Sequence, residues 1–202
     1  MSEGSTIDSS KIKASIPTEI GVEAAKAVAN IAAENDIEIA LAGGIAMHIY
    51  GFTRATTDVD MVARSVLPLP KERELDFGGE GYEIKIGDGN VPVDVIVRED
   101  RLAKIYKAAL DQAKMTDFGV KIISPEWLVV MKHFSARAKD NLDLTWLLQE
   151  EGLVDRDLIE KNLVEAIGED AAYYVAADLE SDYIYADFLK ERERSKYRKE
   201  ER

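Results

Sequence analysis

The sequence predicts an α/β fold with a C-terminal helical region, because strand and helix patterns alternate first and only helical patterns follow. Four segments have the short apolar pattern of strands, and they span residues 38–42, 57–63, 82–86 and 91–97. A Gly-Gly turn and a short helix at 45–50 separate the first two strands. Residues 87–90, Gly-Asp-Gly-Asn, separate the last two and are typical of a hairpin turn. From Ser124 onward, hydrophobic residues recur at helical spacing.

Helices and a loop are expected around these strands. The spacing of apolar residues predicts a first helix over 17–35, with Pro17 in its first turn. A second helix is expected over 98–114, followed by a short strand near 120–123. Prolines and glycines in 65–80 indicate a loop before the hairpin.

One long amphipathic helix is expected after Ser124-Pro125, which supplies a cap and a first-turn proline. Its apolar face is predicted to contain Trp127, Met131, Phe134, Ala138, Leu142 and Trp146. Asp155 is expected to cap a further helix, and a last helix begins near Gly168. The tyrosines of that last helix are interpreted as core or interface residues.

The composition sets limits on fold, compartment and chemistry. With 202 residues, of which 46% are hydrophobic, the chain suits a catalytic domain with a smaller helical region behind it. We expect a flexible N-terminus at 1–15, a catalytic domain at 16–123 and a helical region with a charged tail at 124–202. The absence of cysteine excludes disulfides, zinc–thiolate sites and thiol nucleophiles, and favours a cytoplasmic protein.

The charge and the hydropathy pattern argue against two kinds of partner. A net charge of −13 argues against binding extended duplex DNA, because proteins that wrap duplexes are usually basic. The tail from Lys190 to Arg202 holds seven basic and four acidic residues, which makes it either a local grip for RNA or a solvated helix end. No apolar run reaches the ~20 residues of a membrane span, so no membrane association is expected.

Three aspartates are candidates for metal binding and catalysis. Asp58 and Asp60 are separated by one residue on a predicted strand, so their side chains point to the same side. Asp94 is the only charged residue inside its otherwise apolar strand. Magnesium prefers oxygen ligands and commonly uses one or two carboxylates together with substrate phosphate. Beside these aspartates, Gly43-Gly44 opens a helix, which suits a phosphate group.

The order strand, Gly-Gly, helix, Asp-x-Asp and a later strand aspartate resembles the signature of the nucleotidyltransferase superfamily, the polymerase-beta-like fold. The residues that match this signature are Gly43, Gly44, Asp58, Asp60 and Asp94. The resemblance implies a mixed sheet flanked by helices, with a nucleotidyltransferase catalytic domain at 16–123. It implies that the three aspartates hold Mg²⁺ or Mn²⁺, and Asp94 is the candidate base.

A narrower motif, Gly-x-x-Arg-x-Thr-x-Asp-x-Asp, matches Gly51, Arg54 and Thr56 in front of the two neighbouring aspartates. It resembles the AbiEii-like nucleotidyltransferases, which include toxins of toxin–antitoxin and abortive-infection systems. A second match to this subset, KHFSARAKDNLDL, lies at 132–144. The resemblance implies a nucleotide-binding set that consists of Gly43, Gly44, Arg54, Thr56, Lys132, Lys139, Asp140 and Asp143.

The second match falls on the predicted long helix. On one continuous helix, Lys132, Lys139 and Asp143 would share a narrow stripe that is separate from the apolar face. Arg137 would point away from this stripe and form a salt bridge. The resemblance implies that Lys132 holds the triphosphate and that Asp140 or Asp143 supports the site. The alternative is a solvated charged face.

These observations predict a metal-dependent nucleotidyltransferase that moves an NMP from an NTP to an acceptor hydroxyl and releases pyrophosphate. The resemblance favours RNA, above all tRNA, or a protein as the acceptor, in a toxin-like role with an antitoxin partner. Two alternatives stay open: transfer to a small molecule, as in antibiotic-modifying nucleotidyltransferases, and a non-catalytic nucleotide-binding or interaction module of the same fold. His48 is interpreted as a packing or surface residue, since two histidines without cysteine give no credible zinc site.

Overall fold

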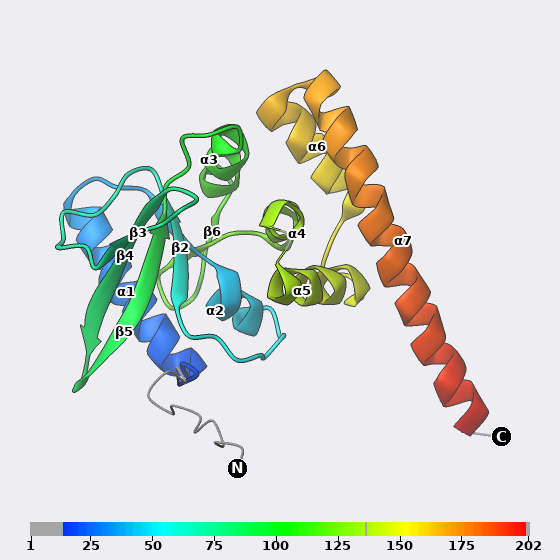
Figure 1. The fold of residues 1–202 in the computed structure, drawn as a ribbon, viewed down its shortest axis with the longest axis horizontal. Helices are drawn as coiled ribbons and strands as arrows, with labels where there is room; N and C mark the ends of the chain where they lie inside the picture. Colours follow the sequence, from blue (N-terminus) through cyan, green and yellow to red (C-terminus); the bar gives the residue numbers. More distant parts are fainter. Residues whose placement is uncertain (1–13, 136, 201–202) are drawn as a thin grey trace, which may run out of the picture.

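The computed structural model describes residues 14–135 and 137–200, and its centre is a mixed sheet with helices packed around it (Figure 1). Over these residues the sheet has seven strands in the order β3-β4-β5-β2-β1-β7-β6. The strands are β1 Ile39–Ala42, β2 Val59–Ala63, β3 Arg73–Glu74, β4 Gly79–Ile86, β5 Gly89–Ile96, β6 Lys114–Met115 and β7 Lys121–Ile122. The predicted α/β fold with a C-terminal helical region is therefore confirmed.

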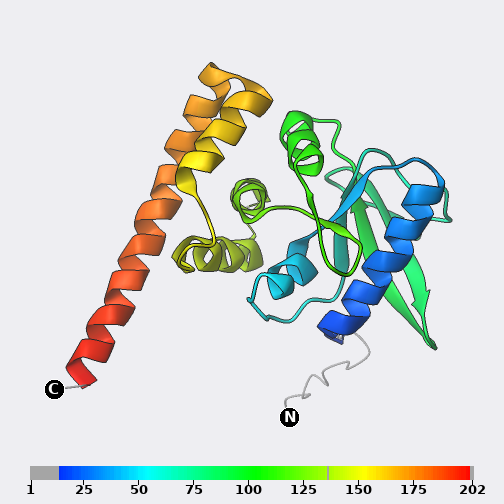
Figure 2. The ribbon, with the colours of Figure 1, turned by 180° about the vertical axis from the view of Figure 1, so that it is seen from behind.

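The three central strands are buried because their sequences are apolar on both faces. β1 is antiparallel to β2, and β2 is parallel to β5. All four residues of β1 are buried, as are Val93 and Val95 of β5. Helices α1 (Thr18–Glu34) and α2 (Gly43–Ile49) pack against this sheet, and Figure 2 shows α1 crossing the β4–β5 hairpin. The helix α2 begins directly at the Gly-Gly pair, earlier than the sequence predicts.

The predicted hairpin is confirmed, and its strands are longer than expected. Ile86 pairs with Gly89 across the two-residue turn Gly87-Asp88, and Gly87 adopts a φ of 57°, which glycine tolerates. The loop predicted over 65–80 is partly wrong, because this segment contains β3 and the start of β4. A two-residue strand has too few side chains to show alternation, so the pairing of β3 with β4 appears only in three dimensions.

The helix predicted over 98–114 is shorter at both ends, because α3 spans Ala103–Asp111. Before it, Arg98 forms a bidentate contact with Asp100, with Nε–Oδ1 and Nη2–Oδ2 distances of 2.9 and 2.5 Å. Asp100 Oδ1 also accepts a hydrogen bond of 3.2 Å from the main-chain N–H of Leu102. These contacts fold the entry to α3 into a turn. After α3, β6 pairs antiparallel with β7, the strand expected there.

The single long helix predicted from Ser124 is wrong, because this segment forms two helices, α4 (Pro125–Ser135) and α5 (Ala138–Gln149). Arg137, which precedes α5, has extended backbone angles, φ −77° and ψ 153°. The apolar periodicity continues through the break, so the sequence pattern does not reveal it. As a result Leu142, expected on the apolar face, is 64% exposed.

The last two helices pack on α4 and α5 from the side away from the sheet (Figures 1 and 2). α6 spans Arg156–Ile167 and is capped as predicted by Asp155, whose Oδ1 accepts hydrogen bonds from the main-chain N–H groups of Asp157 and Leu158. α7 spans Glu169–Glu200, and its C-terminal part extends beyond the rest of the molecule (Figure 1).

The remaining predictions concern the tyrosines of α7 and the two ends of the chain. Among the described tyrosines of α7, a core role fits Tyr183, which is half-buried, whereas Tyr173, Tyr174 and Tyr185 are exposed. The segment 1–15 lies almost wholly outside the described residues, as does the end of the charged tail. No helix in the described part of the chain is long and apolar enough to cross a membrane.

Candidate active site

The register of two parallel strands brings the predicted aspartates together. Asp60 on β2 is the direct neighbour of Asp94 on β5. Direct neighbours on adjacent strands project from the same face of a sheet and lie about 5 Å apart. Asp58 precedes β2 by one residue and is half-buried, like Asp60. The sequence therefore places three carboxylates around one end of the central strands.

Two glycines make room for this cluster. Gly43 has a φ of +58°, and a Cβ atom at this position would overlap the carboxylate of Asp60. A Cβ atom at Gly44 would overlap the Thr56 hydroxyl, which donates a hydrogen bond of 3.1 Å to the main-chain carbonyl of Asp58. The Gly-Gly pair and the carboxylates therefore form one packed unit, and a side chain at either glycine would displace it.

The carboxylate of Asp60 sits in an unfavourable electrostatic environment. Burial raises the pKa of Asp60 above its usual value, and the negative charge of Asp58 raises it further. The positive charges of Lys132, Lys139 and Arg137 act in the opposite direction from a distance. Within the described residues, neither Asp58 nor Asp60 forms an ion pair. A bound cation would relieve the repulsion between these two carboxylates.

Asp94 is held differently from the other two aspartates. Its Oδ1 lies 2.5 Å from Nη2 of Arg73, which comes from β3. The Arg73 side chain passes over Gly81, where a Cβ atom would lie 2.8 Å from Arg73 Cγ. Arg73 carried no signal in the sequence, because it lies in the segment that reads as a loop. In the described chain, no three acidic or histidine side chains are arranged as a ready metal site.

A buried ion network faces the aspartates from the helices α4 and α5. Lys132 Nζ lies 2.6 Å from Asp140 Oδ1 and 2.7 Å from Asp143 Oδ2, and both carboxylates are fully buried. Arg54 binds Asp143 through two nitrogens of its guanidinium, Nε at 2.5 Å and Nη2 at 2.6 Å. Asp143 therefore connects the segment before Asp58 to the helical region.

The second carboxylate of the network is equally saturated. Asp140 Oδ2 accepts hydrogen bonds from Arg137 Nε at 2.5 Å and from Ser135 Oγ at 2.6 Å. Burial alone would raise the pKa of Asp140, but the hydrogen bond from Arg137 and the charge of Lys132 outweigh it and hold this pKa well below its usual range. Asp140 is therefore a fixed anion that orients two cations.

The break between α4 and α5 explains which predictions about this segment are wrong. Lys132 and Asp143 meet across the break rather than along a stripe of one helix. Lys139, predicted on the same stripe, is exposed and lines no part of the pocket. Arg137 forms the expected salt bridge, with Asp140, but it faces the pocket instead of pointing away.

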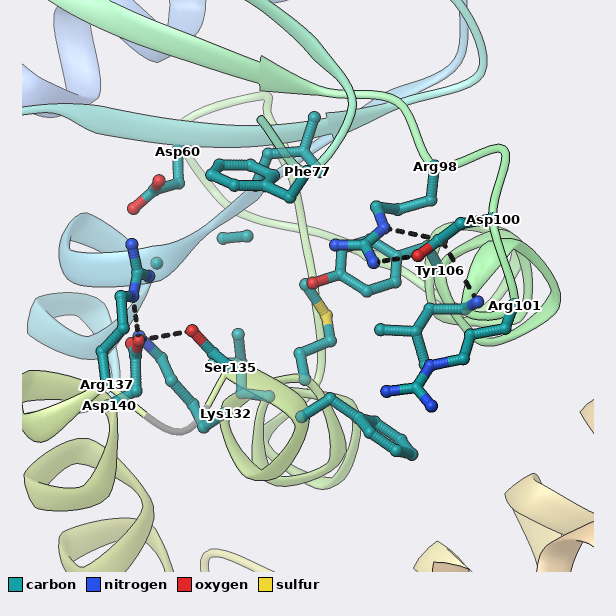
Figure 3. A pocket seen from close by; sticks show the side chains of 17 residues that line it. Asp60, Phe77, Arg98, Asp100, Arg101, Tyr106, Lys132, Ser135, Arg137 and Asp140 are labelled. Atoms are coloured by element: carbon teal, nitrogen blue, oxygen red, sulfur yellow. Dashed lines mark hydrogen bonds and ion pairs between the residues drawn. The ribbon is translucent and has the colours of Figure 1, made fainter. Parts of the chain in front are cut away.

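A pocket of about 340 Å³ lies between the sheet and the helices (Figure 3). At one end it is ionic and is lined by Gly43, Asp60, Lys132, Ser135, Arg137 and Asp140. At the other end Tyr106 and the Arg98–Asp100 pair line it, and the Phe77 ring lies between Asp60 and Tyr106. These residues and Ser135 do not stand out in the sequence. Only their position in the sequence could have indicated them, because Arg98 and Asp100 lie in the loop just after the carboxyl end of β5.

The segment between α2 and β2 is fixed by side chains that play no direct part in the pocket. His48 Nδ1 lies 2.9 Å from the Thr18 hydroxyl, and His48 Nε2 lies 2.6 Å from the carbonyl oxygen of Arg54. Phe52 stacks on Trp146 of α5 with ring centroids 5.0 Å apart. The interpretation of His48 as a packing residue is therefore confirmed.

Comparison with known proteins gives weak likenesses only. No protein-family model matches the chain. No curated protein matches it either. A crystal structure of an antigenic nucleotidyltransferase-like protein from Paracoccidioides brasiliensis is 19% identical, with a TM-score of 0.48 over 84% of this chain and 94% of that one. The solution structure of the antibiotic-resistance factor ANT(2'')-Ia is 14% identical, with a TM-score of 0.43 over 87% of this chain and 100% of that one. With TM-scores this low, function is judged from the side chains of the site.

Proposed function

We propose that this protein transfers a nucleoside monophosphate from an NTP to an acceptor hydroxyl, using Mg²⁺ or Mn²⁺. The observation that carries the proposal is the position of Asp60. It is the neighbour of Asp94 on a parallel strand, packs on Gly43, and faces Lys132 and Arg137 across one pocket. Such a pocket offers carboxylate oxygens for a divalent cation and positive charge for phosphate within the same space.

The residues present fit a divalent cation. Asp58 and Asp60 offer hard oxygen ligands, and among the described residues no cationic side chain forms an ion pair with either of them. Asp94 is the third expected ligand, and a cation bound there would compete with Arg73 for its Oδ1. A bound magnesium ion would neutralise charge on the phosphates and lower the pKa of the attacking hydroxyl.

The nucleotide-binding roles follow from the contacts. Gly43 lines the pocket where a phosphate would lie, and Gly44 packs behind it against Thr56. Lys132 and Arg137 supply positive charge, and Lys139 adds to it from outside the pocket. Four residues support this arrangement from behind, and they are Arg54, Thr56, Asp140 and Asp143.

The proposed reaction is a displacement at the α-phosphorus of the NTP. The acceptor oxygen forms a bond to the α-phosphorus, the bond from that phosphorus to the oxygen bridging to the β-phosphorus breaks, and pyrophosphate leaves. Asp94 accepts the proton of the acceptor hydroxyl. The protein contributes mainly position and charge, since phosphoryl chemistry of this kind needs little covalent participation from side chains.

Several classes of acceptor are compatible with the proposed reaction, and each can be tested. The motif resemblance favours RNA, in particular tRNA, or a protein, with a toxin-like role and an antitoxin partner. The net charge of −13 favours a small or cationic acceptor. Binding of a nucleotide without turnover is the non-catalytic alternative.

The test combines each α-labelled NTP with Mg²⁺ or Mn²⁺, total RNA, cell protein and a set of aminoglycosides. We expect label in one acceptor class for the wild type and none for Asp58→Asn/Asp60→Asn. Asp88→Asn, in the exposed hairpin turn, is the matched control and should behave like the wild type. Equal labelling by the double variant would overturn the proposal, and metal-dependent NTP binding without any product would favour the non-catalytic module.

A further inference from the structure

The end of the pocket away from Asp60 has a different character from the ionic end. The pocket as a whole also has an apolar lining, which consists of Ile96, Leu102, Leu128, Met131 and Phe134. The rings of Phe77 and Tyr106 add two aromatic surfaces (Figure 3). The proposed function places the metal and the phosphates at the ionic end and assigns no part of the substrate to this end.

Tyr106 offers a hydroxyl group that can donate a hydrogen bond to a ligand in the pocket. Its hydroxyl points toward the middle of the pocket in Figure 3 and forms no hydrogen bond with the described residues. Burial raises the pKa of Tyr106 to about 12, so the hydroxyl stays protonated and can donate. The guanidinium of Arg98 lies over the ring, 5.2 Å from its centroid, and holds the ring in position.

The charges at this end favour an uncharged ligand. Arg98 is neutralised by its bidentate contact with Asp100. Arg101, the remaining cation of this end, is exposed. A planar ring with polar atoms on its edge would satisfy the apolar lining, the two aromatic rings and the Tyr106 hydroxyl together.

We propose that this aromatic end binds the nucleobase of the same NTP whose phosphates lie at Asp60, with Phe77 and Tyr106 as the base-contacting residues; the inference rests on the proposed function. The two ends share one continuous pocket. The charges of Asp60 and Arg137 also reach Tyr106, since both affect its pKa. A phosphate chain and a ribose can therefore join the ends within one ligand.

The experiment compares two ligands that share only the phosphates. A non-hydrolysable NTP analogue and inorganic triphosphate are titrated in Mg²⁺ against the full chain, and binding is measured by calorimetry. In the wild type, we expect the analogue to bind at least about tenfold more tightly, because base stacking on aromatic side chains contributes that much. Phe77→Ala should reduce this ratio toward one, and Tyr106→Phe should reduce it severalfold, while triphosphate binding stays unchanged.

The controls separate failure of the inference from failure of the proposed function. Tyr173→Ala, on the exposed part of α7, removes an aromatic ring elsewhere and should leave the ratio unchanged. A wild-type ratio near one, or an unchanged ratio in Phe77→Ala and Tyr106→Phe, would overturn the inference while leaving phosphate binding intact. If neither ligand binds to the folded wild type, the proposed function itself is wrong.

Discussion

The carboxylates on the sheet and those on the helices lie on two sides of one pocket, which Asp60 and Asp140 line, and their electrostatic environments are opposite. Asp140 and Asp143 are fully buried, and each contacts two cationic side chains at 2.5–2.7 Å. Asp58 and Asp60 have no cationic partner in direct contact among the described residues, although they repel each other. The pKa of Asp140 is lowered, whereas that of Asp60 is raised.

This difference separates structural anions from anions that are held for a ligand. The helical pair is complete without any ligand, so its role is to hold Lys132, Arg54 and Arg137 in place. The sheet pair has no such partners among the described residues, which is why we propose it as the site of a divalent cation. An isolated pair of this kind lowers the stability of the folded chain, and function is the common reason for retaining it.

Asp60→Asn should give the largest effect, because it removes a metal ligand and the repulsion together. We expect transfer to fall by at least about 10³-fold, equivalent to several kcal/mol of lost charge stabilisation. The free energy of unfolding should rise, by up to about 2 kcal/mol. Labelled-NTP assays and urea unfolding measure the two changes, with Asp88→Asn as the control. A variant that loses stability would contradict the contrast between the two sides.

Asp143→Asn should act on stability in the opposite direction. It leaves Lys132 and Arg54 buried without their shared counter-ion, so the free energy of unfolding should fall by about 3–5 kcal/mol. The matched control is Asp187→Asn, which breaks a bidentate contact with Arg156 at the surface and should cost less than about 1 kcal/mol. Equal losses of unfolding free energy in the two variants, measured by urea unfolding, would show that the buried network contributes no more to stability than a surface ion pair.

Gly43→Ala tests the packing that joins the two sides. Its φ of +58° disfavours any side chain, and the new methyl group would overlap the Asp60 carboxylate. We expect a loss of at least about 1–2 kcal/mol in stability and a loss of transfer. Gly119→Ala is the control for φ alone, because a Cβ there meets nothing although φ is +85°. If both variants lose stability equally and keep transfer, Asp60 does not depend on Gly43.

The stability gained in Asp60→Asn should depend on pH. The folded-state pKa of Asp60 lies above its ordinary value of 3.8, so the ionised group destabilises the folded state, and protonation removes this penalty. The gap in unfolding free energy between the variant and the wild type should therefore be widest near neutral pH. It should close as the pH falls through the folded pKa toward 3.8. Urea unfolding of both proteins between neutral pH and pH 3.8 measures this gap. A gap that does not change with pH would disprove the raised pKa of Asp60.

Arg73→Met should have the smallest effect and concerns Asp94, the sheet carboxylate that Arg73 contacts. The Arg73 side chain is 38% exposed, so the loss in unfolding free energy should be below about 1 kcal/mol. Without Arg73 at Asp94 Oδ1, the Mn²⁺ concentration for half-saturation should fall severalfold, in a direct binding titration. Lys71→Met, an exposed residue in the same segment, is the control. Weaker Mn²⁺ binding would show that Arg73 assists the site rather than competing with the ion.

The local parts of the fold and of the site could be predicted from the sequence, and the long-range parts could not. Gly43, Asp58 and Asp60 lie within one strand–helix–strand unit, where alternation and turn chemistry fix their positions. The break before α5 could not be predicted because the apolar spacing continues through it, whereas the contacts of Ser135, at the end of α4, and of Arg137 with Asp140 appear only in the folded chain. The positions of Arg73 and Tyr106 in the site could not be predicted, because only folding brings them beside residues that are distant in the sequence.

The pairing of Asp60 with Asp94 makes correct folding and a correct site the same event. A slip of β5 by one residue against β2 would turn Asp94 to the other face of the sheet and put a valine in its place. Such a chain would have most of its secondary structure but no third carboxylate. Specific activity in a refolded sample would then count correctly registered molecules, which circular dichroism cannot distinguish from slipped ones.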